Sequence, residues 1–490
     1  MSEITRRSLL AAASGLTVAA AQQQPGPQRP NVVFYFDDQV RTNELGYNGG
    51  QNIATPNIDR FASQGCRFTN AISSYPLCTP YRAMLQTGRW PSLSGGVMNW
   101  INLPSTGQSF ADVFSRGGYQ TAYVGKWHLA AGRLAGTLKR GNPPRQIAES
   151  EYVPPGPARM GYQHWAAWNF HTAYRRPFYY RDTPERLYFD EYETAAITSE
   201  AMRFIGGRDT SKPFFLMMAP HPPHPPWKAE STPEGSLDRI RKDLHWRANT
   251  KGRRDTRAQD PRCYFAMLQS VDEQFGRMMK FLDESKLADN TIVVFTSDHG
   301  EMMASQSRYD KMVPYCEALN IPMIVRWPGR IQAGRQCDTI FTPIDHLPSL
   351  ATMCGLETPS IVNGKNLSEQ VLHGRGSDPE DALIMNMSSH WDYPETMTMW
   401  PEWRGIRTKQ HTYVRWLDGA EELYDNSADP LQFRNLYDGR KAPAAMEHSR
   451  TRLKELLEEA HDLFPPGTEY LNWFNLDRNL IRNALGPIHG

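Results

Sequence analysis

NVVFYFDD, residues 31–38, joins a run of β-branched and aromatic side chains directly to two aspartates. Continuous apolarity without alternation is typical of a parallel strand that is covered on both faces. Four further runs have the same texture: Thr121–Val124, Pro213–Ala219, Thr291–Thr296 and Ile321–Trp327. Helical patterns of apolar residues lie between them, over Gln108–Arg116 and Tyr264–Leu287. This alternation predicts an α/β fold with a large doubly wound sheet, mixed but mostly parallel, and flanked by helices.

Side chains suited to catalysis follow four of these strands at the point where each strand ends. They are Asp37 and Asp38, Lys126 and His128, His221 and His224, and Asp298 and His299. In an open α/β sheet, ligands bind beyond the carboxyl ends of the strands, so we expect these groups to meet at one edge. Each of them has an ordinary alternative, since aspartates cap helices and a histidine after a strand is often a loop residue. Their convergence favours a functional site.

The acidic members of this set indicate a metal site. Asp37, Asp38 and Asp298 supply three oxygen donors, and His299 adds a nitrogen. This combination favours Ca²⁺ or Mg²⁺ over Zn²⁺. His221 and His224 could suggest zinc, but the two prolines between them prevent the helical presentation that is usual for paired imidazoles. We therefore rank zinc below calcium.

A second motif, CTPYRAMLQTGR over residues 78–89, predicts a short helix with Pro80 at its first helical position, two turns to Gln86 and Gly88 at its end. Cys78 then lies at the helix N-terminus, where unpaired N–H groups favour an anion, and Arg82 adds a cation one turn later. The ordinary alternative is a buried cysteine in a core helix. A cysteine phosphatase is excluded, because the arginine follows the cysteine too closely.

The composition excludes several classes of function. The 490 residues include 54 Lys+Arg and 53 Asp+Glu, so a net charge of +1 provides no general attraction for nucleic acid. Hydrophobic residues make up 40% of the chain, enough for a large core. No apolar run reaches the roughly 18–20 residues of a membrane span, which argues against an integral membrane protein. The six cysteines are widely spaced and resemble neither a disulfide scaffold nor a CxxC metal site.

The first 28 residues have the features of an export signal. Arg6 and Arg7 precede a weakly hydrophobic stretch, and Ala19-Ala20-Ala21 offers a cleavage site. We interpret residues 1–28 as a twin-arginine signal peptide recognised by the twin-arginine export machinery. That interpretation places the mature protein in the periplasm or outside a bacterial cell. The alternative is an amphipathic leader or a cytoplasmic tail.

After about residue 375 the pattern of the sequence changes. Trp403–Trp416 alternates like a half-exposed antiparallel strand, Glu421–Tyr424 follows it, and Ala444–Leu463 predicts a terminal helix. We therefore expect a catalytic domain over residues 29–375. A smaller α+β subdomain with an antiparallel sheet is expected over residues 376–490.

Cys78-Thr79-Pro80-Tyr81-Arg82 with Thr87-Gly88-Arg89 resembles the type I sulfatase signature, C-x-P-x-R followed by T-G-R. The similarity covers most of the mature chain. Its further members, in the order of the family, are Asp37-Asp38, Gly125–His128, His221, Ser297–Gly300, Lys311 and Glu422–Leu436. The chain thus resembles the formylglycine-dependent sulfatases of the alkaline-phosphatase-like superfamily. These enzymes hydrolyse sulfuric esters.

The resemblance implies a metal ion and a modified residue. Asp37, Asp38, Asp298 and His299 would bind one divalent cation together with Cys78, Ca²⁺ in preference to Mg²⁺. Some relatives carry asparagine in place of His299. A formylglycine-generating enzyme, the maturation partner of such sulfatases, would convert Cys78 into formylglycine (3-oxoalanine), whose hydrate has two hydroxyl groups on one carbon.

The resemblance also implies catalytic roles. One hydroxyl of residue 78 would attack the sulfate sulfur, while Arg82, Lys126, Lys311 and the metal hold the anionic oxygens. His221 would protonate the leaving alcohol, with Lys311 as a second candidate. His128 would then take a proton from the second hydroxyl, which expels sulfate and regenerates the aldehyde.

Aromatic and cationic side chains indicate a sulfated carbohydrate as the substrate. The candidates for binding it are His171, Arg175, Arg176, His224, Trp227, His390 and Trp391. Aromatic platforms and arginines suit an anionic sugar, although the same residues are equally compatible with loop packing. Two alternatives stay open at this point. One is a phosphonate monoester or phosphodiester hydrolase on the same scaffold, and the other is a glycan-binding protein whose Cys78 is never modified.

Overall fold

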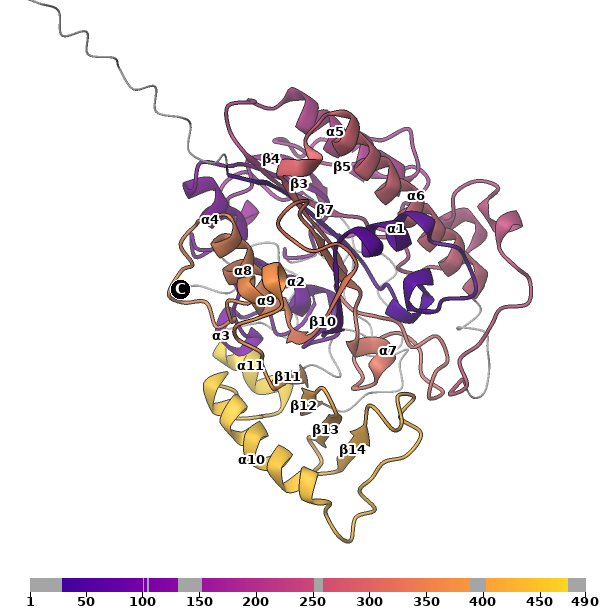
Figure 1. The fold of residues 1–490 in the computed structure, drawn as a ribbon, viewed down its shortest axis with the longest axis vertical. Helices are drawn as coiled ribbons and strands as arrows, with labels where there is room; N and C mark the ends of the chain where they lie inside the picture. Colours follow the sequence, from indigo (N-terminus) through magenta and orange to yellow (C-terminus); the bar gives the residue numbers. More distant parts are fainter. Residues whose placement is uncertain are drawn as a thin grey trace, which may run out of the picture.

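A twisted, mixed sheet with helices on both faces forms the centre of the molecule (Figure 1). The computed structural model describes residues 29–99, 101–103, 105–130, 152–250, 259–387 and 402–474. The strand order is β10 (Arg335–Phe341), β2 (Cys66–Ala71), β9 (Met323–Arg326), β8 (Thr291–Ser297), β1 (Asn31–Asp37), β7 (Phe214–Ala219), β3 (Gln120–Lys126) and β4 (His164–Trp168). The predicted α/β fold with a large, mostly parallel sheet is confirmed.

The four strands that carry the candidate site are neighbours in this sheet. β8, β1, β7 and β3 pair in parallel, and every residue of β1, β7 and β8 is buried. Asp37 at the end of β1 pairs with Ser297 at the end of β8, so these two strands end at the same level. The predicted convergence of their carboxyl ends on one edge is therefore confirmed.

The direction of one strand differs from the prediction. β9, within the apolar run Ile321–Trp327, pairs antiparallel with both β8 and β2. A strand inside a sheet is covered on both faces whichever way it runs, so its continuous apolarity reports burial and not direction. The prediction that this run is a parallel strand is therefore wrong.

Two layers of helices cover the sheet, and each layer encloses its own apolar core. One face carries α1 (Pro56–Gln64), α5 (Glu193–Gly207) and α6 (Pro261–Glu284). The other carries α2 (Cys78–Thr87), α4 (Phe110–Arg116), α8 (His346–Met353) and α9 (Ser368–His373). The expected helix over 108–116 begins at Phe110, because Ser109 and Asp112 form a capping box there. Within the part of the chain that the structure describes, no helix is long and apolar enough to span a membrane.

Shorter elements complete the main part of the molecule. They are α3 (Pro91–Ser94), α7 (Cys316–Leu319) and the two-stranded sheet of β5 (Phe178–Tyr179) and β6 (Leu187–Tyr188). All six cysteines are buried and unpaired, so the fold uses no disulfide among the described residues.

The C-terminal part contains a separate antiparallel sheet, as predicted. Its strands are β11 (Asp381–Asn386), β12 (Trp403–Thr408), β13 (His411–Trp416) and β14 (Glu421–Asp425), with α10 (Ala444–Glu459) and α11 (Gly467–Trp473) beside them. The stretch 403–416, predicted as one strand, is a hairpin in which Trp403 pairs with Trp416. The sequence alternation continues through the short turn, so it did not reveal the reversal of the chain.

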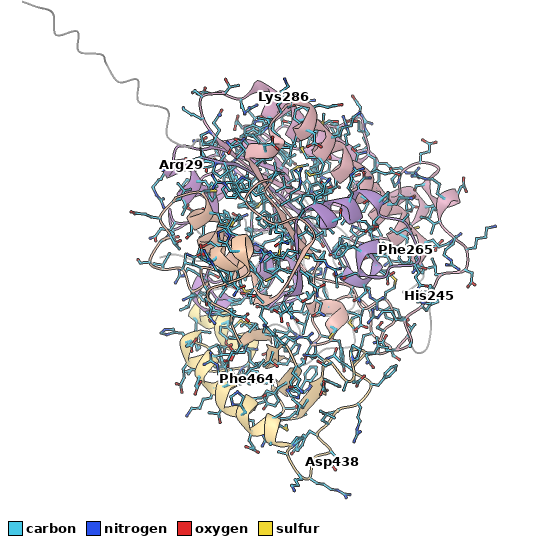
Figure 2. All side chains as sticks on the ribbon, in the orientation of Figure 1. Arg29, His245, Phe265, Lys286, Asp438 and Phe464 are labelled. Carbon is cyan, nitrogen blue, oxygen red and sulfur yellow. The ribbon has the colours of Figure 1, made fainter. Side chains whose placement is uncertain are left out.

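A buried ion pair ties the C-terminal sheet to the segment after α10. The Arg404 guanidinium donates to the Asp462 carboxylate and to the carbonyl of Asn386 (2.9 Å). Both ionic side chains are fully buried, and the ring of Phe464, labelled in Figure 2, lies 4.5 Å from the guanidinium carbon. A buried charge that loses its partner is strongly destabilising.

We expect Asp462→Asn to lower the free energy of unfolding by about 3–5 kcal/mol, because it leaves the Arg404 charge uncompensated in the interior. Urea unfolding followed by tryptophan fluorescence measures the loss. The matched control is Glu369→Gln, which removes the partner of Arg375 in an exposed pair and is expected to cost less than about 1 kcal/mol. Equal effects of the two substitutions would contradict the prediction.

Candidate active site

Cys78 is the first residue of α2 and the centre of the candidate site. Leu77 precedes the helix in an extended conformation, and Gly88 ends it in the left-handed region, as the sequence predicts. The helix starts at Cys78, so Pro80 is its third residue, and the prediction that Pro80 takes the first helical position is wrong. Every residue of α2 is buried. The Cys78 side chain is therefore held rigidly at a helix N-terminus, where N–H groups and the helix dipole favour negative charge.

Three side chains from other elements surround the Cys78 sulfur. Sγ lies 3.3 Å from Nε2 of His299, 3.4 Å from Nζ of Lys311 and 3.9 Å from Oδ1 of Asp38. His299 follows β8, Lys311 lies in the loop between β8 and α7, and Asp38 follows β1. A nucleophile derived from residue 78 would thus stand between the ammonium of Lys311, the imidazole of His299 and the carboxylate of Asp38.

Four potential ligands lie close enough together to share one metal ion. One donor atom from each of Asp38, Cys78, Asp298 and His299 lies within 4.8 Å of the others. Nε2 of His299 is 3.5 Å from Oδ1 of Asp298 and 4.0 Å from Oδ1 of Asp38. The structure thus brings together four of the five predicted ligands in one compact group.

Asp37, the fifth predicted ligand, lies beside this group, and the negative charge of its ionised form is unfavourable there. Its pKa is raised well above the ordinary value by burial and by the nearby charges of Asp298 and Asp38. Both of its carboxylate oxygens are buried, and no described residue donates a hydrogen bond to either. Buried oxygen acceptors without donors, among carboxylates that repel one another, fit a hard divalent cation.

Two cations already compensate part of this negative charge. Oδ2 of Asp38 accepts from Nζ of Lys126 (2.6 Å) and from NH2 of Arg82 (3.0 Å), and Arg82 also reaches Oδ2 of Asp298 (3.2 Å). Burial opposes ionisation of Asp38, but the cations Lys126 and Arg82 hold its pKa well below the usual range. Burial and the Asp38 charge raise the pKa of Asp298 to about 6.

Three histidines line the side of the site near Lys126. Nδ1–H of His221 donates to the carbonyl of His171 (2.8 Å), which turns Nε2 toward Nζ of Lys126 at 3.1 Å. Nδ1–H of His224 donates to the carbonyl of Pro225 (2.7 Å). Burial and nearby cations, Lys126 among them, lower the pKa values of His128, His221 and His224 well below 6.5. Imidazoles in this environment are neutral near pH 7.

Asp38, His221 and His224 also place donor atoms within 4.8 Å of one another. Such a set would suit zinc. The ammonium of Lys126, however, lies 2.6 Å from Asp38 and 3.1 Å from His221. A positive charge already stands between the two potential ligands, in agreement with the low rank given to zinc from the sequence.

The other candidate substrate residues have structural partners. Arg175 donates to the carbonyls of Thr232 and Ala229 (2.8 Å each), and the guanidinium of Arg176 lies over the ring of Tyr188. Nε2 of His171 donates to the carbonyl of Phe178. Trp227 is 3% exposed, with its indole N–H on the carbonyl of Pro223. The arrangement favours loop packing for these four residues. His390 and Trp391 lie outside the described residues.

Two site residues escaped the sequence analysis. Gln39, directly after the aspartate pair, accepts from Nζ of Lys311 through Oε1 (2.8 Å). Its position in the chain was the available signal. Glu193, the first residue of α5, accepts the backbone N–H of His221 (2.8 Å), and burial raises its pKa to about 8. Nothing in the sequence around Glu193 distinguishes it from a surface residue of a helix.

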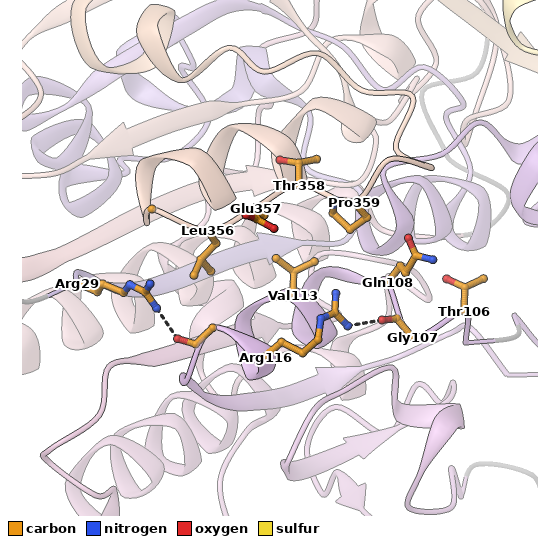
Figure 3. A pocket seen from close by; sticks show the side chains of 12 residues that line it. Arg29, Thr106, Gly107, Gln108, Val113, Arg116, Leu356, Glu357, Thr358 and Pro359 are labelled. Carbon is orange, nitrogen blue, oxygen red and sulfur yellow. Dashed lines mark hydrogen bonds between the residues drawn. The ribbon is translucent and has the colours of Figure 1, made fainter.

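A cavity of about 740 Å³ lies elsewhere in the molecule (Figure 3). Its lining includes Arg29, Arg116 and Glu357, and the two guanidinium groups donate to the backbone carbonyls of Gly117 and Gly107. None of the side chains around Cys78 lines this cavity. The candidate site is therefore at the edge of the sheet and not in this cavity.

Comparison with known proteins identifies the family. The sulfatase family model matches residues 30–356, and the model of the N-sulphoglucosamine sulphohydrolase C-terminal region matches residues 305–460. An ulvan-active sulfatase of Formosa agariphila is 33% identical over 94% of this chain and 87% of its own length. An endo-4-O-sulfatase of Bacteroides thetaiotaomicron is 31% identical, covering 86% and 92%.

A solved structure agrees with these matches. The crystal structure of the Bacteroides fragilis sulfatase yidJ has a TM-score of 0.79 and 30% identity, covering 92% of this chain and 99% of that one. Family model, relatives and fold all give the same assignment. The chain is a sulfatase, a member of the sulfatase family within the alkaline-phosphatase-like superfamily.

Proposed function

We propose that this sulfatase removes sulfate ester groups from a sulfated carbohydrate, with residue 78 in the formylglycine form and a bound calcium ion. The observation that carries the proposal is the position of Cys78, at a helix N-terminus, within 4.8 Å of donor atoms of Asp38 and Asp298 and 3.4 Å from Nζ of Lys311. Relatives named as an ulvan-active sulfatase and an endo-4-O-sulfatase support a carbohydrate substrate.

The metal ion would be held by Asp37, Asp38, Asp298 and His299 together with residue 78. When bound, it would supply positive charge to the sulfate oxygens and to the attacking hydroxyl. Oxygen donors outnumber nitrogen in this set, which favours Ca²⁺, and Mg²⁺ less so. Arg82 orients two of these ligands, since its NH2 group donates to both Asp38 and Asp298.

The remaining residues would bind sulfate and move protons. Lys126 and Lys311 offer ammonium groups to the sulfate oxygens. His221 is assigned as the proton donor to the leaving alcohol. The pKa of the His221 imidazole is lowered, and the anionic substrate would raise it. Lys126 is in contact with Nε2 of His221. His128 is neutral in this environment and suits the role of general base toward the second hydroxyl of the formylglycine hydrate, whose deprotonation releases sulfate.

The rest of the proposal concerns maturation and location. We assign residues 1–28 to a twin-arginine signal peptide, 29–375 to the catalytic domain and 376–490 to the C-terminal subdomain. Cys78 is 1% exposed, so a formylglycine-generating enzyme would have to act before folding buries it. Export to the periplasm or beyond is compatible with that order, because twin-arginine transport carries folded protein.

We expect Cys78→Ala to lower kcat/KM for sulfate release by about 10³-fold or more, because it removes the attacking group. Cys263→Ala, at an equally buried cysteine of α6, should leave kcat/KM within about twofold. Sulfate release from a panel of sulfated oligosaccharides measures both. The tryptic peptide of residue 78 should weigh about 18 Da less than its unmodified form. Preference for an aryl phosphodiester over every sulfate ester would contradict the proposal.

Removal of calcium should lower the melting temperature, because an ion that binds only the folded state stabilises it by about 2.7 kcal/mol at a hundredfold excess over Kd. We expect chelation followed by calcium titration to show this shift in the native protein and not in Asp37→Asn. Asp272→Asn, at a buried carboxylate that accepts from Asn57 and Ile58, keeps the shift and serves as the control. A calcium response in Asp37→Asn equal to that of the native protein would count against the ligand set.

The acid limb of the pH–rate profile should lie below pH 6.5. Burial, Lys126 and Arg82 lower the pKa of His128, so its neutral form persists to lower pH and activity falls only as the pH drops through that lowered value. Profiles of kcat for sulfate release measure the limb, because His128 would act after sulfate has been transferred to residue 78, and His128→Gln should abolish it. A limb at or above pH 6.5 would argue against His128 as the base.

A further inference from the structure

Gln39 occupies an unusual place at the centre of the site. It follows the aspartate pair, is fully buried, and has a φ of 73°, in the left-handed region that non-glycine residues seldom adopt. Its backbone N–H donates to Oδ1 of Asp298 (3.1 Å). A strained residue at an active site points to a function for its side chain.

The Gln39 amide connects the Lys311 ammonium to the buried carboxyl group of Glu301. Oε1 accepts from Nζ of Lys311 (2.8 Å), and Nε2 donates to Oε2 of Glu301. The ammonium fixes the orientation of the amide, because a flip would set Nε2 against another donor. Glutamine thus offers an acceptor to one neighbour and a donor to the other.

Glu301 in turn anchors the loop that carries Lys311. Its Oε1 accepts the backbone N–H of Met303 (2.8 Å) and of Asp310 (3.0 Å). Asp310 and Met312, on either side of Lys311, have positive φ values of 63° and 70°. The loop is therefore bent sharply around the lysine, and its two ends are joined through one buried carboxylate.

We propose that Gln39 is a positioning residue that holds the Lys311 ammonium against residue 78, with Glu301 as its anchor. Nζ of Lys311 lies 3.4 Å from Sγ of Cys78, and the lysine side chain is 2% exposed. A long, flexible side chain placed there needs a fixed acceptor to keep one rotamer. This inference rests on the proposed function, in which Lys311 contacts the sulfate group.

The first test exchanges the two partners. Gln39→Glu sets two carboxylates against each other, and Glu301→Gln sets an amide N–H₂ against that of Gln39, so each alone should lower kcat by about 10–100-fold. The double variant Gln39→Glu, Glu301→Gln restores one donor and one acceptor, and it should recover at least half of the native kcat. Single variants with native kcat, or a double variant no better than the singles, would overturn the proposal.

The second test asks whether Gln39 acts through Lys311. Gln39→Leu should lower kcat by about 10–100-fold in the native background and by less than about twofold in Lys311→Ala, because coupled residues are not additive. A general loss of structure would lower kcat equally in both. Gln370→Leu, at a buried glutamine of α9, is the matched control and should leave kcat within about twofold.

A structural readout separates this inference from the proposed function. In a crystal structure of Gln39→Leu we expect Nζ of Lys311 to leave residue 78 by more than about 1 Å while the Asp298 carboxylate stays in place. If the native protein released no sulfate from any ester, the proposed function would fail and this displacement would still decide the role of Gln39. An unmoved Lys311 would overturn the inference.

Discussion

Three carboxylates at the ends of two neighbouring parallel strands are the constraint from which the rest of the site follows. Asp37 ends β1, Asp38 follows it and Asp298 follows β8, and the pairing of these strands brings the three acids to one level. Their mutual repulsion in a buried setting is costly unless cations accompany them. Arg82 and Lys126 supply two positive charges, and the oxygens of Asp37 still have no donor among the described residues.

Helix α2 links this charge balance to the reacting group. Cys78 and Arg82 lie one turn apart on a helix that is buried along its whole length, so the proposed nucleophile position and the cation that bonds Asp38 and Asp298 form one rigid unit. Any shift of the helix would disturb both at once. The close packing of α2 therefore fixes the position of Cys78 relative to the carboxylates.

The edge of the sheet and the members of the site were predictable because continuous apolarity marks buried strands and their carboxyl ends must coincide. The direction of β9 was not predictable, because a strand inside a sheet is apolar whichever way it runs. β2 escaped because its partly exposed residues interrupt the apolar run. Gln39 and Glu193 escaped for another reason: their partners, Glu301 and His221, lie 262 and 28 residues away in the sequence.

The candidate substrate residues in loops are harder to assign than the groups at the strand ends, and the reason is physical. Arginines and aromatics in loops satisfy backbone carbonyls and neighbouring rings as readily as ligands, as Arg175 and Trp227 do here. Residue type alone therefore cannot separate binding from packing. The sheet imposes the geometry of the residues at its strand ends, whereas it does not fix the geometry of the loops. The side chains at the strand ends could therefore be grouped from the sequence, and those in the loops could not.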